Sequence, residues 1–125
     1  RMAIGHVGMG TGGGGGKQIA WAKHKNVYIE SGGITWLFHK EFYPYPSAVK
    51  AIRKAIEICG VEKLMWGSDY PRTMTAITYG MSKDFIEKST ALSDEEKKKI
   101  LGENAKGFYG FPELEVPEKI INMVE

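Results

Sequence analysis

The sequence predicts an α/β fold built on a parallel sheet, and three observations support this prediction. First, short apolar segments at residues 2–7, 26–30 and 63–67 have the composition of strands that are covered on both faces. Second, segments with helical features separate these strands, which is typical of a parallel sheet with right-handed crossovers. Third, polar residues stand at the carboxyl end of each strand, where parallel α/β proteins build their sites.

The clearest helix is predicted over residues 48–59. Its apolar residues recur at helical spacing and give the helix one buried face. Ser47 is expected to cap its amino end, and Gly60 is expected to end it. Cys59, the one cysteine of the chain, falls on the apolar face, where we expect a small buried side chain.

Helices are predicted at four further places: residues 17–23, residues 81–89, residues 93–106, and a last one after Pro117. The third of them has the best start signal. Ser93 and Glu96 have the spacing of a capping box, in which each side chain accepts a hydrogen bond from the backbone of the other residue.

Charge and cysteine content exclude several classes of protein. The chain has 125 residues, 17 of them basic and 15 acidic, and its net charge of +2 is too small for electrostatic binding of nucleic acid. The single cysteine excludes an internal disulfide and a multi-cysteine zinc module, and it is the one argument for a cytoplasmic location. No apolar run approaches the ~20 residues that a membrane span needs. Because Arg1 leads at once into a strand, we expect further residues upstream.

Glycine is the most unusual feature of the composition, with 16 residues, five of them consecutive at residues 12–16. We expect a loop there, because glycine loses the most backbone entropy on ordering. Gly8, Gly10 and Gly13 also match the dinucleotide-binding pattern, and Glu30 ends the next strand as a candidate ribose ligand. Such a match is weak in a glycine-rich segment. A Rossmann-like nucleotide-binding module is therefore the alternative, and a loop that approaches a ligand is favoured.

The strongest chemical signal is Asp69, within the Gly-Ser-Asp-Tyr-Pro block at the end of the third strand. Pro71 keeps a helix from starting at once, so the carboxylate is presented at the strand end. An aspartate in this place can bind a metal or accept a proton from metal-bound water. It can also cap the following turn, and spacing alone favours this second role.

Three histidines and one arginine are further candidates. His6 ends the first strand beside glycines, and its imidazole suits metal binding or acid–base chemistry, with a hydrogen-bonded core histidine as the alternative. His39 lies in a long aromatic loop that can face a site, whereas His24 is expected at a solvated helix end. Arg72 follows the Gly-Ser-Asp-Tyr-Pro block and can pair with a substrate carboxylate, with surface solvation as the alternative.

Together these residues resemble the amidohydrolase superfamily, in particular its amidohydrolase-related branch of metal-dependent hydrolases and decarboxylases. The likeness covers the chain up to about Phe111 and leaves residues 112–125 as a tail. The Gly-Ser-Asp-Tyr-Pro and Glu-Asn-Ala blocks are its most specific parts. The matching segments are residues 5–8, 26–30, 59–64, 66–71 and 102–106.

The resemblance implies that the chain is the last part of a (β/α)8 barrel, comprising strands six to eight and the closing helices, with metal at the carboxyl face. Asp69 matches the aspartate after strand eight, which binds the metal and orients or deprotonates water. His6 matches the histidine after strand six, which contacts substrate, acts as an acid–base group or binds a second metal. Trp36, His39 and Arg72 are expected to contact substrate.

The superfamily's His-x-His pair and its histidine after strand five have no counterpart in these 125 residues. A catalytic zinc site takes about three protein ligands, so we expect the chain to need an upstream half or another copy of itself. The expected function is zinc-dependent hydrolysis of a C–N or C–O bond in a small molecule. The alternative within the superfamily is non-oxidative decarboxylation of an aromatic or unsaturated acid. We expect no nucleic-acid or membrane partner.

Overall fold

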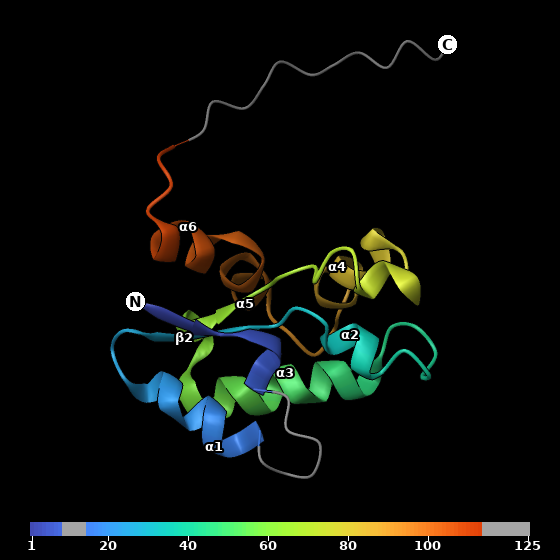
Figure 1. Ribbon diagram of the computed structural model, residues 1–125, viewed down its shortest axis with the longest axis horizontal. Helices are drawn as coiled ribbons and strands as arrows, with labels where there is room; N and C mark the ends of the chain where they lie inside the picture. The colour runs from blue at the N-terminus through green and yellow to red at the C-terminus, as the bar shows by residue number, and fades with distance from the viewer. Residues whose placement is uncertain (9–14, 114–125) are drawn as a thin grey trace.

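The predicted parallel sheet is confirmed. The structure, a computed structural model, describes residues 1–8 and 15–113. Three parallel strands, β1 (Met2–Ile4), β2 (Val27–Glu30) and β3 (Leu64–Met65), lie in the order β1-β2-β3 (Figure 1). Strand β1 is at one edge of the sheet, where the Met2 side chain is half exposed.

All three strands are shorter than predicted, β2 by its first residue only and β1 and β3 by more. Strand β1 ends at Ile4 because His6 and Val7 adopt left-handed backbone angles, with φ of 58° and 53°, inside a helical turn η1 (Gly5–Gly8). Strand β3 has only two residues and follows a second turn, η3 (Val61–Lys63). Val7 is nevertheless buried, so the apolar run continues into a buried turn and cannot be distinguished from strand by hydrophobicity alone.

The predicted long helix is confirmed as α3 (Pro46–Cys59), which ends before Gly60 at a φ of 87°. The prediction for its amino end is wrong. Pro46 occupies the first helical position, and no side chain caps the helix. The Ser47 N–H instead donates to Glu41 Oε2 at 3.0 Å.

The helix expected after the glycines is present as α1 (Gly15–Ala20), which continues into the turn η2 (Trp21–Lys23). The end of the glycine run is therefore helical, and the prediction of a loop over the whole run is wrong for Gly15 and Gly16. Residues 9–14, which include Gly10 and Gly13, lie outside the described residues.

The next described helices follow the central strand β2 and the edge strand β3. A short helix that the sequence did not predict, α2 (Ile34–Leu37), follows β2, and the turn η4 (Thr73–Thr75) and helix α4 (Tyr79–Glu87) follow β3. Helix α4 begins two residues before the predicted 81–89. The helix expected after Pro117 lies outside the described residues.

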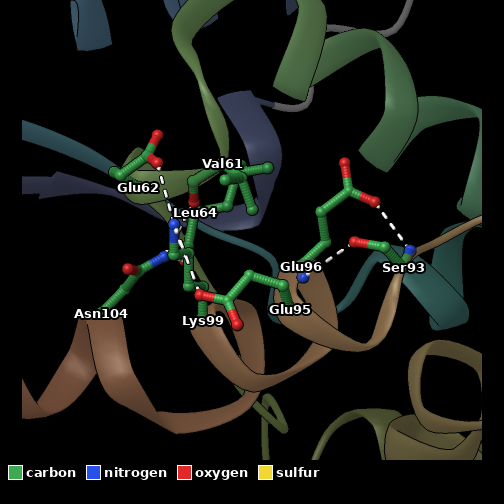
Figure 2. Close-up of polar contacts among 8 residues, drawn as sticks. All are labelled: Val61, Glu62, Leu64, Ser93, Glu95, Glu96, Lys99 and Asn104. Carbon is green, nitrogen blue, oxygen red and sulfur yellow. Dashed lines mark hydrogen bonds and ion pairs between the residues drawn. The ribbon is translucent and has the colours of Figure 1, made fainter.

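The predicted capping box is confirmed at the start of α5 (Asp94–Lys98), as Figure 2 shows. Ser93 Oγ accepts from the Glu96 N–H at 3.2 Å, and Glu96 Oε2 accepts from the Ser93 N–H at 2.8 Å. A π-helical turn, η5 (Lys99–Glu103), joins α5 to α6 (Asn104–Tyr109). The helical segment thus extends beyond the predicted 106 and contains a π turn that no sequence pattern indicated.

Helices lie on both faces of the sheet, as the apolar strands predicted, but β1 stays largely exposed and in this respect departs from the prediction. In Figure 1, α1 and α3 lie on one side of the sheet, and α5 and α6 lie on the other. Ile29 and Leu64 of adjacent strands are fully buried, together with Ile52, Phe85 and Ile100 of the surrounding helices and turns. Full burial of such a side chain stabilises the folded state by roughly 1.5–3 kcal/mol.

The amino edge of the sheet is fixed by hydrogen bonds from side chains to backbone carbonyls. Asn104 Nδ2 donates to the carbonyls of Val61 and Leu64, at 2.8 and 2.7 Å (Figure 2). Lys63 Nζ donates to the carbonyls of His24 and Lys25, at 3.0 and 2.9 Å. These contacts fix the start of β3 and the turn before β2, and so determine where the carboxyl ends of the strands lie. No helix among residues 1–8 and 15–113 is long and apolar enough to cross a bilayer.

Candidate functional site

The segments that follow the three strands bring His6 and Asp69 together over Gly33. A Cβ atom added to Gly33 would lie 2.8 Å from Asp69 Oδ2 and 3.0 Å from His6 Nδ1. Gly33 has a φ of 73°, which glycine adopts without strain, so both the space and the backbone conformation require glycine here. The two residues that the sequence singled out as metal ligands therefore converge on one point at the carboxyl edge of the sheet.

The Asp69 carboxylate is not used to cap the turn that follows it. Ser68 Oγ accepts from the Tyr70 N–H at 3.2 Å, and the Thr73 N–H donates to the backbone carbonyl of Asp69 at 3.1 Å. Within residues 1–8 and 15–113, the carboxylate itself accepts no hydrogen bond. The turn-capping alternative is therefore wrong, because the neighbouring serine has that role. Asp69 is half buried, and its φ of 52° is left-handed, a strained conformation that concentrates at functional sites.

His6 is oriented by a backbone carbonyl. Its Nδ1 lies 2.7 Å from the carbonyl oxygen of Gly32, so Nδ1 carries the proton and donates it to that oxygen. The Nε2 atom then keeps its lone pair for a metal ion or a proton. Metal-binding histidines in proteins are typically oriented in this way, by a hydrogen bond from the second ring nitrogen. His6 is exposed and is not a histidine of the core.

Glu30 is a site residue that sequence reasoning considered only as a ribose ligand. Its Oε1 accepts from the Gly32 N–H at 2.6 Å, so one carboxylate oxygen is engaged by the protein itself. The signal that could have found it is the glycine at each strand end. A Cβ added to Gly67 would coincide with Glu30 Oε1, and one added to Gly5 would lie 3.7 Å from Oε2.

The three residues expected to contact substrate form a second cluster. The Arg72 guanidinium lies over the Trp36 ring, with 4.5 Å between Cζ and the ring centroid. The His39 ring lies 5.7 Å from the Trp36 ring, and its Nδ1 is hydrogen-bonded to the Trp36 carbonyl. Stacking orients the guanidinium plane while leaving its N–H groups at the edge free to bind an anion. Trp36 belongs to α2, which begins directly after Gly33 and so connects this cluster to His6 and Asp69.

The other two candidates have the structural roles that the sequence predicted. His24 is exposed at the end of η2. Cys59 is half buried near the end of α3, where its Sγ–H donates to the carbonyl of Ala55 at 3.2 Å. Burial raises the pKa of the Cys59 thiol, which disfavours the reactive thiolate.

The donor set at this edge suits a divalent metal in type and is incomplete in number. An imidazole nitrogen and a carboxylate oxygen are both ligands that zinc takes. Within the described part of the chain, no group of three or more His, Cys, Asp and Glu side chains is close enough to hold a metal ion. The described residues therefore offer two suitable donors, fewer than the three that a catalytic zinc site takes from the protein.

A separate surface pocket between α4 and the α5–α6 segment contains none of these residues. Lysine and glutamate side chains dominate its lining, together with Leu101 and Phe111. Several of its charged residues pair with a neighbour on the chain, as Lys83 does with Glu87 at 3.0 Å. We therefore place the site at the carboxyl edge of the sheet.

Comparisons with known proteins identify a family and a fold. A sequence model of the amidohydrolase family matches residues 1–111. Comparison with curated protein sequences gave no match. Two solved structures are similar over most of this chain. One is a candidate 2-pyrone-4,6-dicarboxylic acid hydrolase from Pseudomonas putida, with a TM-score of 0.65 and 25% identity over 90% of this chain. The other is an amidohydrolase from Burkholderia multivorans with bound zinc, with a TM-score of 0.68 and 19% identity over 88% of this chain. Our chain spans 44% of the length of each.

Proposed function

The chain belongs to the amidohydrolase family, and from this premise we propose that it supplies part of the active site of a metal-dependent hydrolase that acts on C–N or C–O bonds. The observation that carries the proposal is the convergence of His6 and Asp69 over Gly33. Three parallel strands with helical crossovers would be strands six to eight of a (β/α)8 barrel, whose active site lies at the carboxyl face of the strands.

In this proposal Asp69 and His6 are ligands of a zinc ion. Zinc supplies Lewis-acid polarisation of the scissile group and lowers the pKa of a bound water. The Asp69 carboxylate accepts no hydrogen bond within the described residues, so it is available both to bind a cation and to accept a proton. The His6 imidazole presents Nε2, because Nδ1 donates to the carbonyl of Gly32. The presence of zinc in the similar Burkholderia multivorans amidohydrolase supports the choice of metal.

The substrate that best fits the second cluster is a small molecule with a carboxylate. Arg72 would pair with that carboxylate, while Trp36 and His39 would contact the rest of the molecule. The name of the similar Pseudomonas putida protein describes hydrolysis of a dicarboxylic acid, which supports hydrolysis as the first choice. Non-oxidative decarboxylation of an aromatic or unsaturated acid is the alternative, because the same arginine would orient the carboxylate that is lost.

A further part of the protein would complete the metal site. The chain spans less than half of the similar structures, and β1 is at an edge of the sheet. The missing ligands would come either from an upstream half of a longer chain or from a second copy of this one. The nucleotide-binding alternative loses support, because the Glu30 carboxylate accepts from the Gly32 N–H and the chain belongs to a hydrolase family.

Zinc titration of the 125-residue chain tests the proposal, with calorimetry for affinity and NMR for location. We expect zinc to perturb the signals of His6 and Asp69. The variants Asp69→Asn and His6→Gln should each weaken binding by about tenfold or more, since even outer-shell changes around metals cost 10–100-fold. Matched controls are Asp94→Asn in α5 and His24→Gln at the end of η2, whose side chains are exposed. Unchanged zinc binding in both site variants would rule the metal site out.

A further inference from the structure

The Glu30 carboxylate occupies a space that glycines at neighbouring strand ends leave open. Glu30 is the last residue of β2 and is half buried. A Cβ added to Gly32 would lie 2.5 Å from Glu30 Oε1, and one added to Gly67 would coincide with that oxygen. Alanine at Gly67 is therefore incompatible with the present position of Glu30, and the glycines define a fitted space for this side chain.

The contacts of Glu30 connect it to His6 through Gly32. Glu30 Oε1 accepts from the Gly32 N–H at 2.6 Å, and the Gly32 carbonyl accepts from His6 Nδ1 at 2.7 Å. The N–H and the carbonyl of Gly32 lie in successive peptide planes that meet at its Cα, so anchoring the first plane restrains the segment from which the second one projects. Among residues 1–8 and 15–113, no lysine or arginine forms an ion pair with Glu30. Its charge is therefore not used in a salt bridge. In this it differs from Glu62 and Glu96, which pair with Lys99 and Arg53.

We propose that Glu30 is a positioning residue, which fixes the Gly32 carbonyl and thereby the orientation and tautomer of the His6 imidazole. A free neutral imidazole prefers to carry its proton on Nε2. In that tautomer Nε2 has no lone pair with which to bind a metal ion. The hydrogen bond from Nδ1 to the Gly32 carbonyl reverses that preference. The structural part of this proposal stands on the contacts, and its consequence for zinc rests on the proposed function.

Three variants separate positioning from a direct role of the charge. Glu30→Ala removes the acceptor for the Gly32 N–H. Glu30→Gln keeps an oxygen acceptor of the same size and removes the charge. Gly67→Ala keeps Glu30 unchanged but displaces its carboxylate, which can move because it is the end of a flexible side chain. Matched controls are Glu57→Gln on the exposed face of α3 and Gly102→Ala, where an added Cβ has no atom within 4 Å.

The first readout is the His6 tautomer, measured from the ring ¹⁵N shifts of the neutral imidazole in the labelled 125-residue chain. We expect the Nδ1–H form in the wild type, in Glu30→Gln and in both controls. Glu30→Ala and Gly67→Ala should both shift the ring towards the Nε2–H form. Spectral dispersion and urea midpoints report whether each variant is folded, and Gly67→Ala provides the test if Glu30→Ala does not fold.

Zinc affinity is the second readout, and it should fall by about tenfold in Glu30→Ala and Gly67→Ala but not in Glu30→Gln. A folded Glu30→Ala or Gly67→Ala variant that keeps the Nδ1–H tautomer overturns the proposal. So does a Glu30→Gln variant that behaves like Glu30→Ala, because the charge and not the position would then matter. If the wild type binds no zinc, His6 and Asp69 do not form a metal site by themselves, and the tautomer measurement still decides the role of Glu30.

Discussion

The carboxyl edge of the sheet and the α5–α6 segment, residues 93–109, use polar side chains in opposite ways. In the α5–α6 segment, polar side chains satisfy the backbone or each other: Asn104 bonds two carbonyls, and Ser93 and Glu96 cap a helix (Figure 2). At the carboxyl edge, His6 and Asp69 have left-handed backbones, and Asp69 has a carboxylate that caps nothing within the described residues. The first arrangement lowers the free energy of the fold, and the second raises it.

This difference shows that the two most specific sequence blocks have different roles, one in stability and one at the candidate site. The Glu-Asn-Ala block looked as characteristic of the family as the Gly-Ser-Asp-Tyr-Pro block, yet its asparagine ties α6 to the start of β3. In α/β barrels, residues that matter at the amino face of the strands serve stability, and those at the carboxyl face serve chemistry. Substitutions in the two regions should therefore separate stability from ligand binding.

The largest effect on stability is expected for Asn104→Ala. The change removes both donors to the carbonyls of Val61, which is half buried, and Leu64, which is fully buried, and leaves these acceptors without this partner. Loss of such bonds should destabilise the fold by about 2–3 kcal/mol, with no direct effect on zinc binding by the folded chain. Urea unfolding measures the loss, and Asn26→Ala is the matched control because Asn26 is exposed. A loss no greater than that of the control would mean that α6 is not tied to β3 in this way.

A smaller loss is expected for Ser93→Ala. This change removes the acceptor for the Glu96 N–H at the start of α5, and helix caps of this kind stabilise by about 1 kcal/mol. The matched control is Thr90→Ala, which removes the hydroxyl of an exposed threonine in the preceding loop. Equal urea midpoints for the two variants would show that the capping box does not stabilise the helix.

How much the sequence could predict differs between the same two regions. The capping box and the end of α3 follow from local patterns, because hydrogen bonds between near neighbours determine them. The parallel sheet follows from the alternation of apolar strands with helices along the chain. The end of β1 at Ile4 and the left-handed backbones of His6 and Val7 do not, because packing of distant segments imposes them against local preference. The role of Glu30 was missed for the same reason: its partner Gly32 is near in sequence, but the space it fills is closed by Gly67.

A gain in stability is expected at the carboxyl edge for Asp69→Gly. Glycine adopts the φ of 52° without the steric cost that a side chain meets, and the change removes no hydrogen bond of the carboxylate within the described residues. After the entropy that glycine loses on folding, we expect a gain of about 0.5 kcal/mol, together with loss of zinc binding. Asp69→Asn is the control, since asparagine tolerates the left-handed region as aspartate does and should give no such gain. A clear loss of stability in Asp69→Gly would show that this edge is not strained.

The smallest expected effect is a change in how stability depends on pH, and it arises at Glu96 in the α5–α6 segment. The backbone hydrogen bond from Ser93 and the Arg53 guanidinium hold the pKa of Glu96 below its ordinary value. A lowered pKa in the folded state stabilises the fold fully above the ordinary carboxyl pKa of about 4.3, and this stabilisation is lost as pH falls towards the folded value. Partly exposed ion pairs contribute less than about 1 kcal/mol, so Glu96→Gln should lower the free energy of unfolding only slightly at pH 7. It should also make the free energy of unfolding fall less steeply as the pH is lowered. Urea midpoints measured from about pH 3 to about pH 7, a range that spans carboxyl titration, give that slope. Glu57→Gln should leave it unchanged, and an equal slope in the wild type and in Glu96→Gln would place the acid-sensitive contacts elsewhere.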